Sequence, residues 1–132
     1  MRITRLLRRF LSIGGSVVPQ RQIHQPVPQV SSFDVERVAR REFKNDFTTV
    51  MALLNDLETA RIKLAVLKLA DGSVEKLRSN IDSAKCDYRD VLAPAEYPEY
   101  CKRGFRVSEW PAEERSRIIE SDWRQYEDWL RK

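Results

Sequence analysis

Histidine is almost missing from this 132-residue sequence, because His24 is the only one and it lies in a stretch rich in proline and glutamine. Without a histidine in the part expected to fold, a serine or cysteine nucleophile has no imidazole to act as its general base. The sequence also contains no H-x-x-x-H motif, calcium loop or glycine-rich phosphate-binding loop. We therefore expect no catalytic, metal-binding or cofactor-binding residues and no enzyme activity.

Cysteine is scarce as well, and Cys86 and Cys101 are the only two. They form no C-x-x-C pair of the kind that binds zinc, and two cysteines do not make the dense framework of a small oxidised domain. We expect both thiols to be reduced. A reducing compartment such as the cytosol or the mitochondrial matrix agrees with this expectation.

Long apolar runs are absent too. The best candidate, residues 62–70, is interrupted by Lys63 and Lys68, and it falls well short of the roughly 20 apolar residues that a membrane-spanning helix needs. We expect no membrane span. With 42% hydrophobic and 33% charged residues, the composition is that of a folded chain and not of a disordered one.

The first 25 residues lack acidic side chains and carry five arginines, at positions 2, 5, 8, 9 and 21. Wound as a helix, the opening residues form a short basic amphipathic segment followed by serine and glycine, which is typical of an organelle presequence. We predict a mitochondrial presequence over residues 1–18, with a first cut after Phe10 and removal of residues 11–18. A plastid transit peptide and a basic tail that contacts RNA or anionic lipid are the alternatives.

The positive net charge of +4 belongs to this leader. The remaining residues hold 19 basic and 20 acidic groups, a formal charge of −1. Because nonspecific attraction to nucleic acid depends on positive charge, the rest of the chain does not favour it. Residues 19–32, with three prolines and four glutamines, predict a flexible linker, and residues 33–132 are expected to form a single helical domain.

An antiparallel helical hairpin is expected to organise this all-α domain. A long first helix over about residues 33–70 is predicted by apolar residues spaced three and four apart: Val50, Leu53, Leu57, Ala60, Leu64 and Leu67. A break at Asp71-Gly72-Ser73 follows. The second helix, over about residues 74–92, repeats the spacing and is expected to end before Pro94. A connector rich in aromatic residues leads to a C-terminal helix over about residues 111–131.

The first helix of this hairpin is about twice as long as the second, so its beginning, residues 33–49, needs another cover. Either the C-terminal helix or a partner protein can supply it. Tryptophan and tyrosine, which often anchor interfaces, are concentrated near the C-terminus. The residues predicted to bind a partner are Val35, Val38, Phe43, Phe47, Trp110, Trp123, Tyr126 and Trp129. A small aromatic core is the alternative interpretation of the C-terminal aromatics.

Basic residues alternate with aromatic ones in the connector, and this combination can hold phosphates and stack bases. The residues of this alternative RNA-binding site are Lys102, Arg103, Arg106, Tyr100 and Phe105. Our leading hypothesis remains a non-catalytic accessory or assembly subunit of a larger mitochondrial complex, on the matrix side, which binds protein subunits. The alternative is a mitochondrial ribosome-associated protein that contacts RNA.

Overall fold

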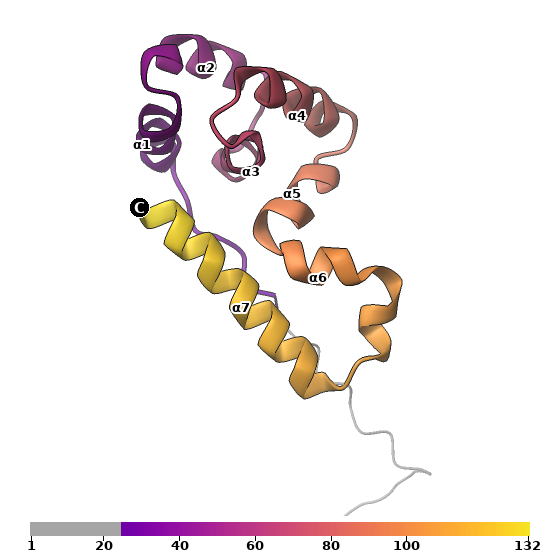
Figure 1. Cartoon of the computed structure of the whole chain (residues 1–132). Helices are drawn as coiled ribbons and strands as arrows, with labels where there is room; N and C mark the ends of the chain where they lie inside the picture. The colour runs from indigo at the N-terminus through magenta and orange to yellow at the C-terminus, as the bar shows by residue number, and fades with distance from the viewer. Residues whose placement is uncertain (1–24) are drawn as a thin grey trace, which may run out of the picture.

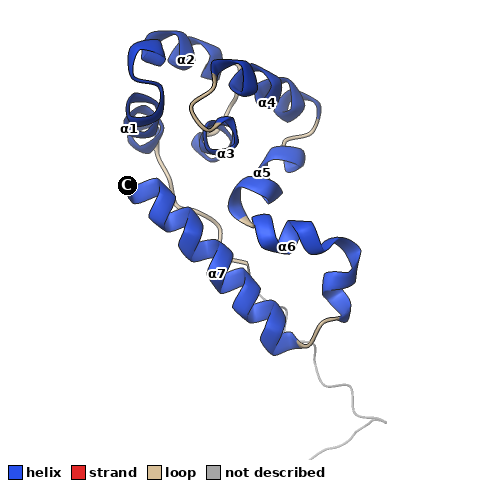
Figure 2. Ribbon diagram, in the orientation of Figure 1, coloured by secondary structure: helices blue, strands red, loops and turns tan. Residues whose placement is uncertain are grey.

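A computed structural model of the chain describes residues 25–132, with the side chains of Phe105, Val107 and Ser108 excepted. In this part of the chain all regular elements are helical and none is a strand (Figure 2), so the predicted all-α class is confirmed. The presequence predicted over residues 1–18 lies outside the described residues. No helix between residues 25 and 132 is both long enough and apolar enough to cross a membrane.

The prediction of a single helix over residues 33–70 is wrong, because the helix is interrupted twice in this segment. It comprises α1 (Ser32–Phe43), the 3₁₀ turn η1 (Lys44–Asp46), α2 (Phe47–Leu54) and α3 (Ala60–Ala70). The first break is at Lys44, whose φ of 44° cannot continue a right-handed helix. At the second, Thr59 is extended and its hydroxyl accepts the Ile62 N–H at 3.2 Å, which starts α3 afresh. Residues 55–59, four of which are polar, make this turn.

A tight turn joins α3 to α4 (Val74–Cys86), and these two helices pack against each other. Asp71 and Gly72 both have positive φ, 49° and 80°, the conformation that commonly ends a helix. The Ser73 hydroxyl then accepts the Lys76 N–H at 3.2 Å and caps α4. The predicted break at residues 71–73 is therefore present.

The second helix was expected to continue to residue 92 and stop before Pro94, and both details are wrong. α4 ends at Cys86, Asp87 is extended, and α5 (Arg89–Glu96) contains Pro94. Asp87 restarts the helix because its carboxylate accepts the Arg89 N–H at 3.0 Å. Pro94 withholds one hydrogen bond from the carbonyl of Asp90, and Asp90 is an exposed residue, where the loss of one such bond is expected to cost little.

The connector, expected to be ordered but without a regular period, is helical. It forms α6 (Pro98–Arg103) and the 3₁₀ segment η2 (Gly104–Glu109), and α7 (Ala112–Arg131) begins after Pro111 as predicted. Figure 1 shows α7 running along the molecule until its C-terminal end reaches α1. There the Arg41 guanidinium donates to the carbonyls of Leu130 and Lys132, both at 3.4 Å. The end of the C-terminal helix thus meets α1, but α1 packs mainly against α3, so most of the cover comes from within the segment predicted as one helix and not from either predicted cover.

One continuous core results from these contacts. Its largest contributions come from α1, α2, α3, α4, α5 and α7. The bulkier buried residues are Val35, Val38, Phe43, Val50, Leu54, Leu64, Leu67, Leu77, Ile81, Val91, Tyr126 and Trp129.

Residues 25–31 precede α1 and run along α7 without regular structure (Figure 1). The Tyr97 hydroxyl donates to the Pro26 carbonyl at 2.6 Å, Pro28 is buried, and Val30 packs against the core. Over these residues the predicted flexible linker is instead a segment held on the helices. Its upstream part, to residue 24, lies outside the described residues.

A candidate binding groove

A hollow of about 800 Å³ opens beside the turn that joins α2 to α3. Proteins usually bind ligands or partner segments in hollows of this size when the lining is mainly apolar. The lining residues come from the turn, α3, the end of α4 and the start of α5: Asp56, Leu57, Glu58, Thr59, Arg61, Ile62, Ala84, Lys85, Tyr88 and Leu92.

The breaks in the helices place apolar residues at the floor of this hollow. Leu57 lies in the turn and is only 7% exposed, and Leu92 is 9% exposed. Tyr88 precedes α5 and has 52% of its surface exposed, so an aromatic ring lies partly open to solvent beside the apolar floor. Had α4 continued through Asp87, as expected, the predicted apolar stripe would have placed Tyr88 in the hairpin interface.

Two ion pairs frame the hollow. Lys85 Nζ lies 2.9 Å from Asp56 Oδ2, which ties the end of α4 to the turn, and this hydrogen bond raises the pKa of Lys85. The Arg61 guanidinium donates from Nε and Nη2 to the two oxygens of Glu96, both at 2.7 Å. Glu96 is 3% exposed, and its hydrogen bond raises the pKa of Arg61. The Arg61–Glu96 pair therefore fixes the wall between α3 and α5.

A second hollow, of about 420 Å³, adjoins the first, since Arg61, Tyr88 and Leu92 line both. Residues 25–27 line its other side. Burial raises the pKa of Tyr97 to about 12, so at neutral pH its hydroxyl keeps the proton that it donates to Pro26. We refer to the two adjoining hollows as the groove.

Asp122 on α7 has a structural task nearby. It is 2% exposed, and its carboxylate accepts the backbone N–H groups of Glu99 at 3.2 Å and Tyr100 at 2.9 Å. A helix N-terminus has unpaired N–H groups that need acceptors, so Asp122 caps α6 from a different helix. Among the described residues, no group of three or more histidine, cysteine, aspartate or glutamate side chains has the arrangement of a metal site.

The predicted partner-binding residues are mostly inside the molecule. Val35, Val38, Phe43, Tyr126 and Trp129 are buried, so in this structure they do not form an open surface. Phe47 is half-buried, with the Arg40 guanidinium 4.0 Å from its ring centroid. Trp110 and Trp123 are also half-buried. The premise of an uncovered arm was wrong because α1 folds back onto α3 instead of extending beyond it.

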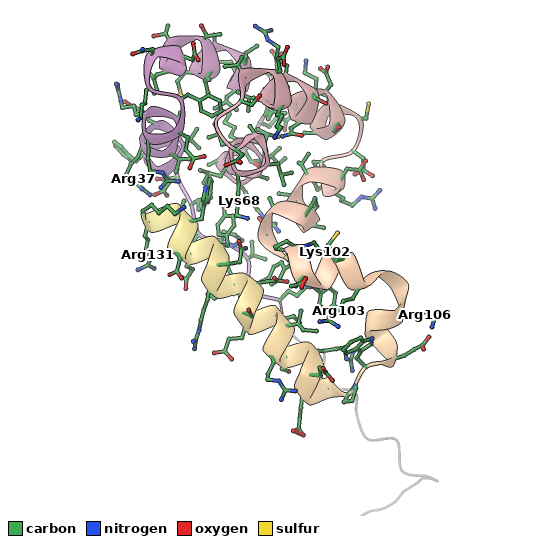
Figure 3. All side chains as sticks on the ribbon, in the orientation of Figure 1. Arg37, Lys68, Lys102, Arg103, Arg106 and Arg131 are labelled. Carbon is green, nitrogen blue, oxygen red and sulfur yellow. The ribbon has the colours of Figure 1, made fainter. Side chains whose placement is uncertain are left out.

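The predicted RNA-binding residues are only partly brought together. Lys102 and Arg106 are exposed, whereas Arg103 lies between α6 and α7 (Figure 3), 4.3 Å from the centroid of the Trp110 ring. Arg106 points away from the helices (Figure 3). Tyr100 is half-buried, and the side chain of Phe105 lies outside the described part. Two exposed cations therefore remain here, and Lys102 lies 4.0 Å from Glu99.

The groove residues were not singled out from the sequence as a site. Leu57 belongs to the apolar spacing of the first predicted helix, and Ile62, Ala84 and Tyr88 fall within the two predicted helices, which indicates burial but not an opening. The local signal of a break there is the group of four polar residues at 55, 56, 58 and 59, which the continuing apolar spacing outweighs. Comparison of the chain with protein-family models, with curated proteins and with solved structures gave no match.

Proposed function

We propose that this protein is a non-catalytic accessory or assembly subunit of a larger mitochondrial protein complex, in the matrix or on the matrix side of the inner membrane. The location rests on the arginine-rich, acid-free leader. The binding role rests on one observation, the half-exposed ring of Tyr88 at the edge of an apolar groove. Aromatic residues at partly apolar surfaces are frequent anchors of protein interfaces.

The charged residues around the groove also support a role in protein contacts. Lys85 pairs with Asp56, Arg61 with Glu96, and Arg89 with Asp87 at 2.8 Å. These pairs stabilise the walls without leaving a concentrated charge of one sign. Such a surface suits apolar contact with a protein better than attraction of a polyanion.

Native fractionation tests this proposal. Mitochondria that contain the tagged protein are solubilised gently and separated on native gels and sucrose gradients, with and without RNase. We expect the protein to migrate with a particle much larger than 15.5 kDa, and RNase to leave that migration unchanged. Migration of the wild-type protein as a free monomer would contradict the proposal.

A pair of exposed aromatic residues gives matched variants for the same experiment. Tyr88→Ala removes the ring at the groove and is expected to move most of the protein to the free fraction. Phe33→Ala removes a ring that is 82% exposed on α1 and is expected to leave the particle intact. If only Phe33→Ala releases the protein, the binding surface is on α1 and not at the groove.

A ribosome-associated role is the second candidate, favoured by the exposure of Lys102 and Arg106. Under this hypothesis RNase would release the protein from its particle. The double variant Lys102→Ala, Arg106→Ala would also weaken the association, and more strongly as the salt concentration rises. Full association of that variant at raised salt would remove the case for RNA contact.

A further inference from the structure

Arg61 has a hydrogen-bonding capacity that the fold does not use. Its Nε and Nη2 atoms hold both oxygens of Glu96 at 2.7 Å, but its Nη1 atom donates to none of the described residues. The Arg61 side chain is 34% exposed and lines both hollows of the groove. Arg61 thus brings a guanidinium group that retains donors beyond those used by Glu96 to a groove with an apolar floor, and a hydrogen-bond acceptor on an occupant can use them.

The charges around this donor nearly cancel, and this balance bears on whether the bound segment is charged or uncharged. Glu96 neutralises Arg61, and Asp56 neutralises Lys85. Glu58, the remaining charged residue of the larger hollow, is exposed and has no ion-pair partner among the described residues. An acidic occupant would meet the carboxylates of Glu58 and Glu96 without a free cation to compensate. An uncharged occupant with a carbonyl acceptor meets no such cost.

A segment of this chemistry already forms one wall of the adjoining hollow, which residues 25–27 line. Residues 25–30, Gln-Pro-Val-Pro-Gln-Val, are uncharged and contain two prolines. They lie against Tyr97, Trp123 and Tyr126, and the Tyr97 hydroxyl donates to the Pro26 carbonyl at 2.6 Å. Proline-containing segments suit aromatic grooves because they are stiff before binding and leave their carbonyls free to accept hydrogen bonds.

We propose that the larger hollow is the docking site for an uncharged, proline-containing apolar segment of a partner protein. A backbone carbonyl of that segment accepts a hydrogen bond from Arg61 Nη1, and an apolar side chain lies between Ile62, Leu92 and Tyr88. The partner segment thereby continues the surface on which residues 25–27 already lie. This inference rests on the proposed role as a protein-binding subunit and specifies the chemistry of the segment that is bound.

A peptide titration of the purified full chain tests the proposal. The probe is the acetylated and amidated peptide Gln-Pro-Val-Pro-Gln-Val. Two-dimensional NMR of the protein's methyl groups monitors its binding. We expect saturable shifts of the Ile62, Ala84 and Leu92 signals. Absence of shifts up to millimolar peptide would overturn the proposal. Shifts confined to the surroundings of Tyr97 and Tyr126 would also overturn it, because they would mean that the probe only exchanges with residues 25–30.

Variants locate the site and test the chemistry. Tyr88→Ala and Ile62→Glu are expected to weaken peptide binding at least tenfold, whereas Phe33→Ala is expected to change it less than twofold. Arg61→Lys keeps the charge opposite Glu96 but loses the open Nη1 donor, and a several-fold weakening is expected. Circular dichroism of each variant checks that it is folded. Unchanged affinity in folded Tyr88→Ala would place the peptide elsewhere.

The charge argument has its own control. A probe with both glutamines replaced by glutamate is expected to bind several-fold more weakly, and equal affinity would contradict the proposal. The titration uses purified protein, so its failure leaves the fractionation result intact. A chain that migrates with a mitochondrial particle but binds no probe would retain the proposed function and lose only this docking mode.

Discussion

Glu96 connects three helices through one residue. Its carboxylate on α5 accepts both Arg61 donors from α3, and its backbone carbonyl accepts from the Gln125 side chain of α7 at 3.4 Å. Arg61 and Glu96 are 35 positions apart, and no periodic pattern links residues so distant. The sequence could predict which residues are apolar or charged, but not this pairing, because the pairing depends on how α3 and α5 cross.

Replacement of Glu96 by glutamine is expected to lower the free energy of unfolding by about 2–4 kcal/mol, since it leaves the partly buried Arg61 without a countercharge. Urea denaturation followed by circular dichroism measures the change. Glu36→Gln is the control, because Glu36 pairs with Arg40 on the exposed side of α1 at 3.0 Å. This control is expected to cost less than about 0.5 kcal/mol, and an equal loss in both variants would contradict the importance of burial.

Tyr97 gives the fold a dependence on alkaline pH. Burial raises its pKa to about 12, above the value of about 10 in an unfolded chain. The folded state therefore favours the neutral phenol. Its contribution to stability is complete below about pH 10 and is lost as the pH rises from 10 through 12. We expect the urea midpoint of the wild-type protein to fall over that interval.

Tyr97→Phe isolates this effect. At pH 7 the variant should lose about 0.5–1.5 kcal/mol, the net contribution of the hydrogen bond to Pro26, and its stability should fall less steeply between pH 10 and 12. The quantity to compare is the difference in the free energy of unfolding between the wild-type protein and Tyr97→Phe at each pH. Burial also raises the pKa of Tyr126 and lowers the pKa of Lys68. These two groups titrate alike in the wild-type protein and in Tyr97→Phe. Parallel pH curves would show that Tyr97 does not titrate in this way.

At the scale of elements, the helical class was predictable and the helix boundaries were not. Apolar spacing predicted helix over the residues of α3, α4 and α7 within longer or merged segments, and the Asp71-Gly72-Ser73 turn was predicted because glycine and a capping serine mark it locally. The breaks at Lys44 and Thr59 were missed because the apolar spacing continues across them. Pro94 was expected to stop a helix, but the hydrogen bond that it withholds is the one to the carbonyl of Asp90, an exposed residue, and the helix continues.

Gly72 tests the turn between α3 and α4. Its φ of 80° favours glycine, and an added Cβ would lie 3.5 Å from the Glu42 carbonyl oxygen, an ordinary contact. Gly72→Ala should therefore lower stability by about 1–2 kcal/mol through backbone strain alone, measured by urea denaturation. Ser79→Ala, at an exposed position of α4, should stay within about 0.5 kcal/mol. A neutral Gly72→Ala would mean that the turn relaxes without cost.

At the scale of the whole molecule, the sequence suggested a hairpin with an uncovered arm, whereas the described chain folds α1 and α7 back onto one core. Helix lengths estimated from spacing misled here, because a continuous helix of about 37 residues would have been ~55 Å long at 1.5 Å per residue. The candidate groove escaped prediction for the same reason. It exists only where the breaks expose Tyr88 and the polar residues of the turn over 55–59, while Leu57 stays buried.

The leader gives a separate prediction for the whole chain. Fusion of residues 1–32 to a fluorescent reporter should send the reporter to mitochondria and yield a shortened product, which microscopy and immunoblotting of cell fractions would detect. A variant with alanine at Arg2, Arg5, Arg8 and Arg9 should remain in the cytosol, because import depends on the basic face of the segment. Retention of the intact unaltered fusion in the cytosol would defeat the import hypothesis.

The cap that Asp122 supplies to α6 carries a consequence for the order of folding. A helix of six residues has no stability of its own in water, and the acceptor for its first N–H groups is 22 positions further along the chain from Tyr100. α6 should therefore form only once α7 has docked. In the unaltered protein, α6 and α7 should therefore open as one cooperative unit. In native-state hydrogen exchange, Asp122→Ala should accelerate exchange at Tyr100 and Cys101 and leave the amides of α3 slow.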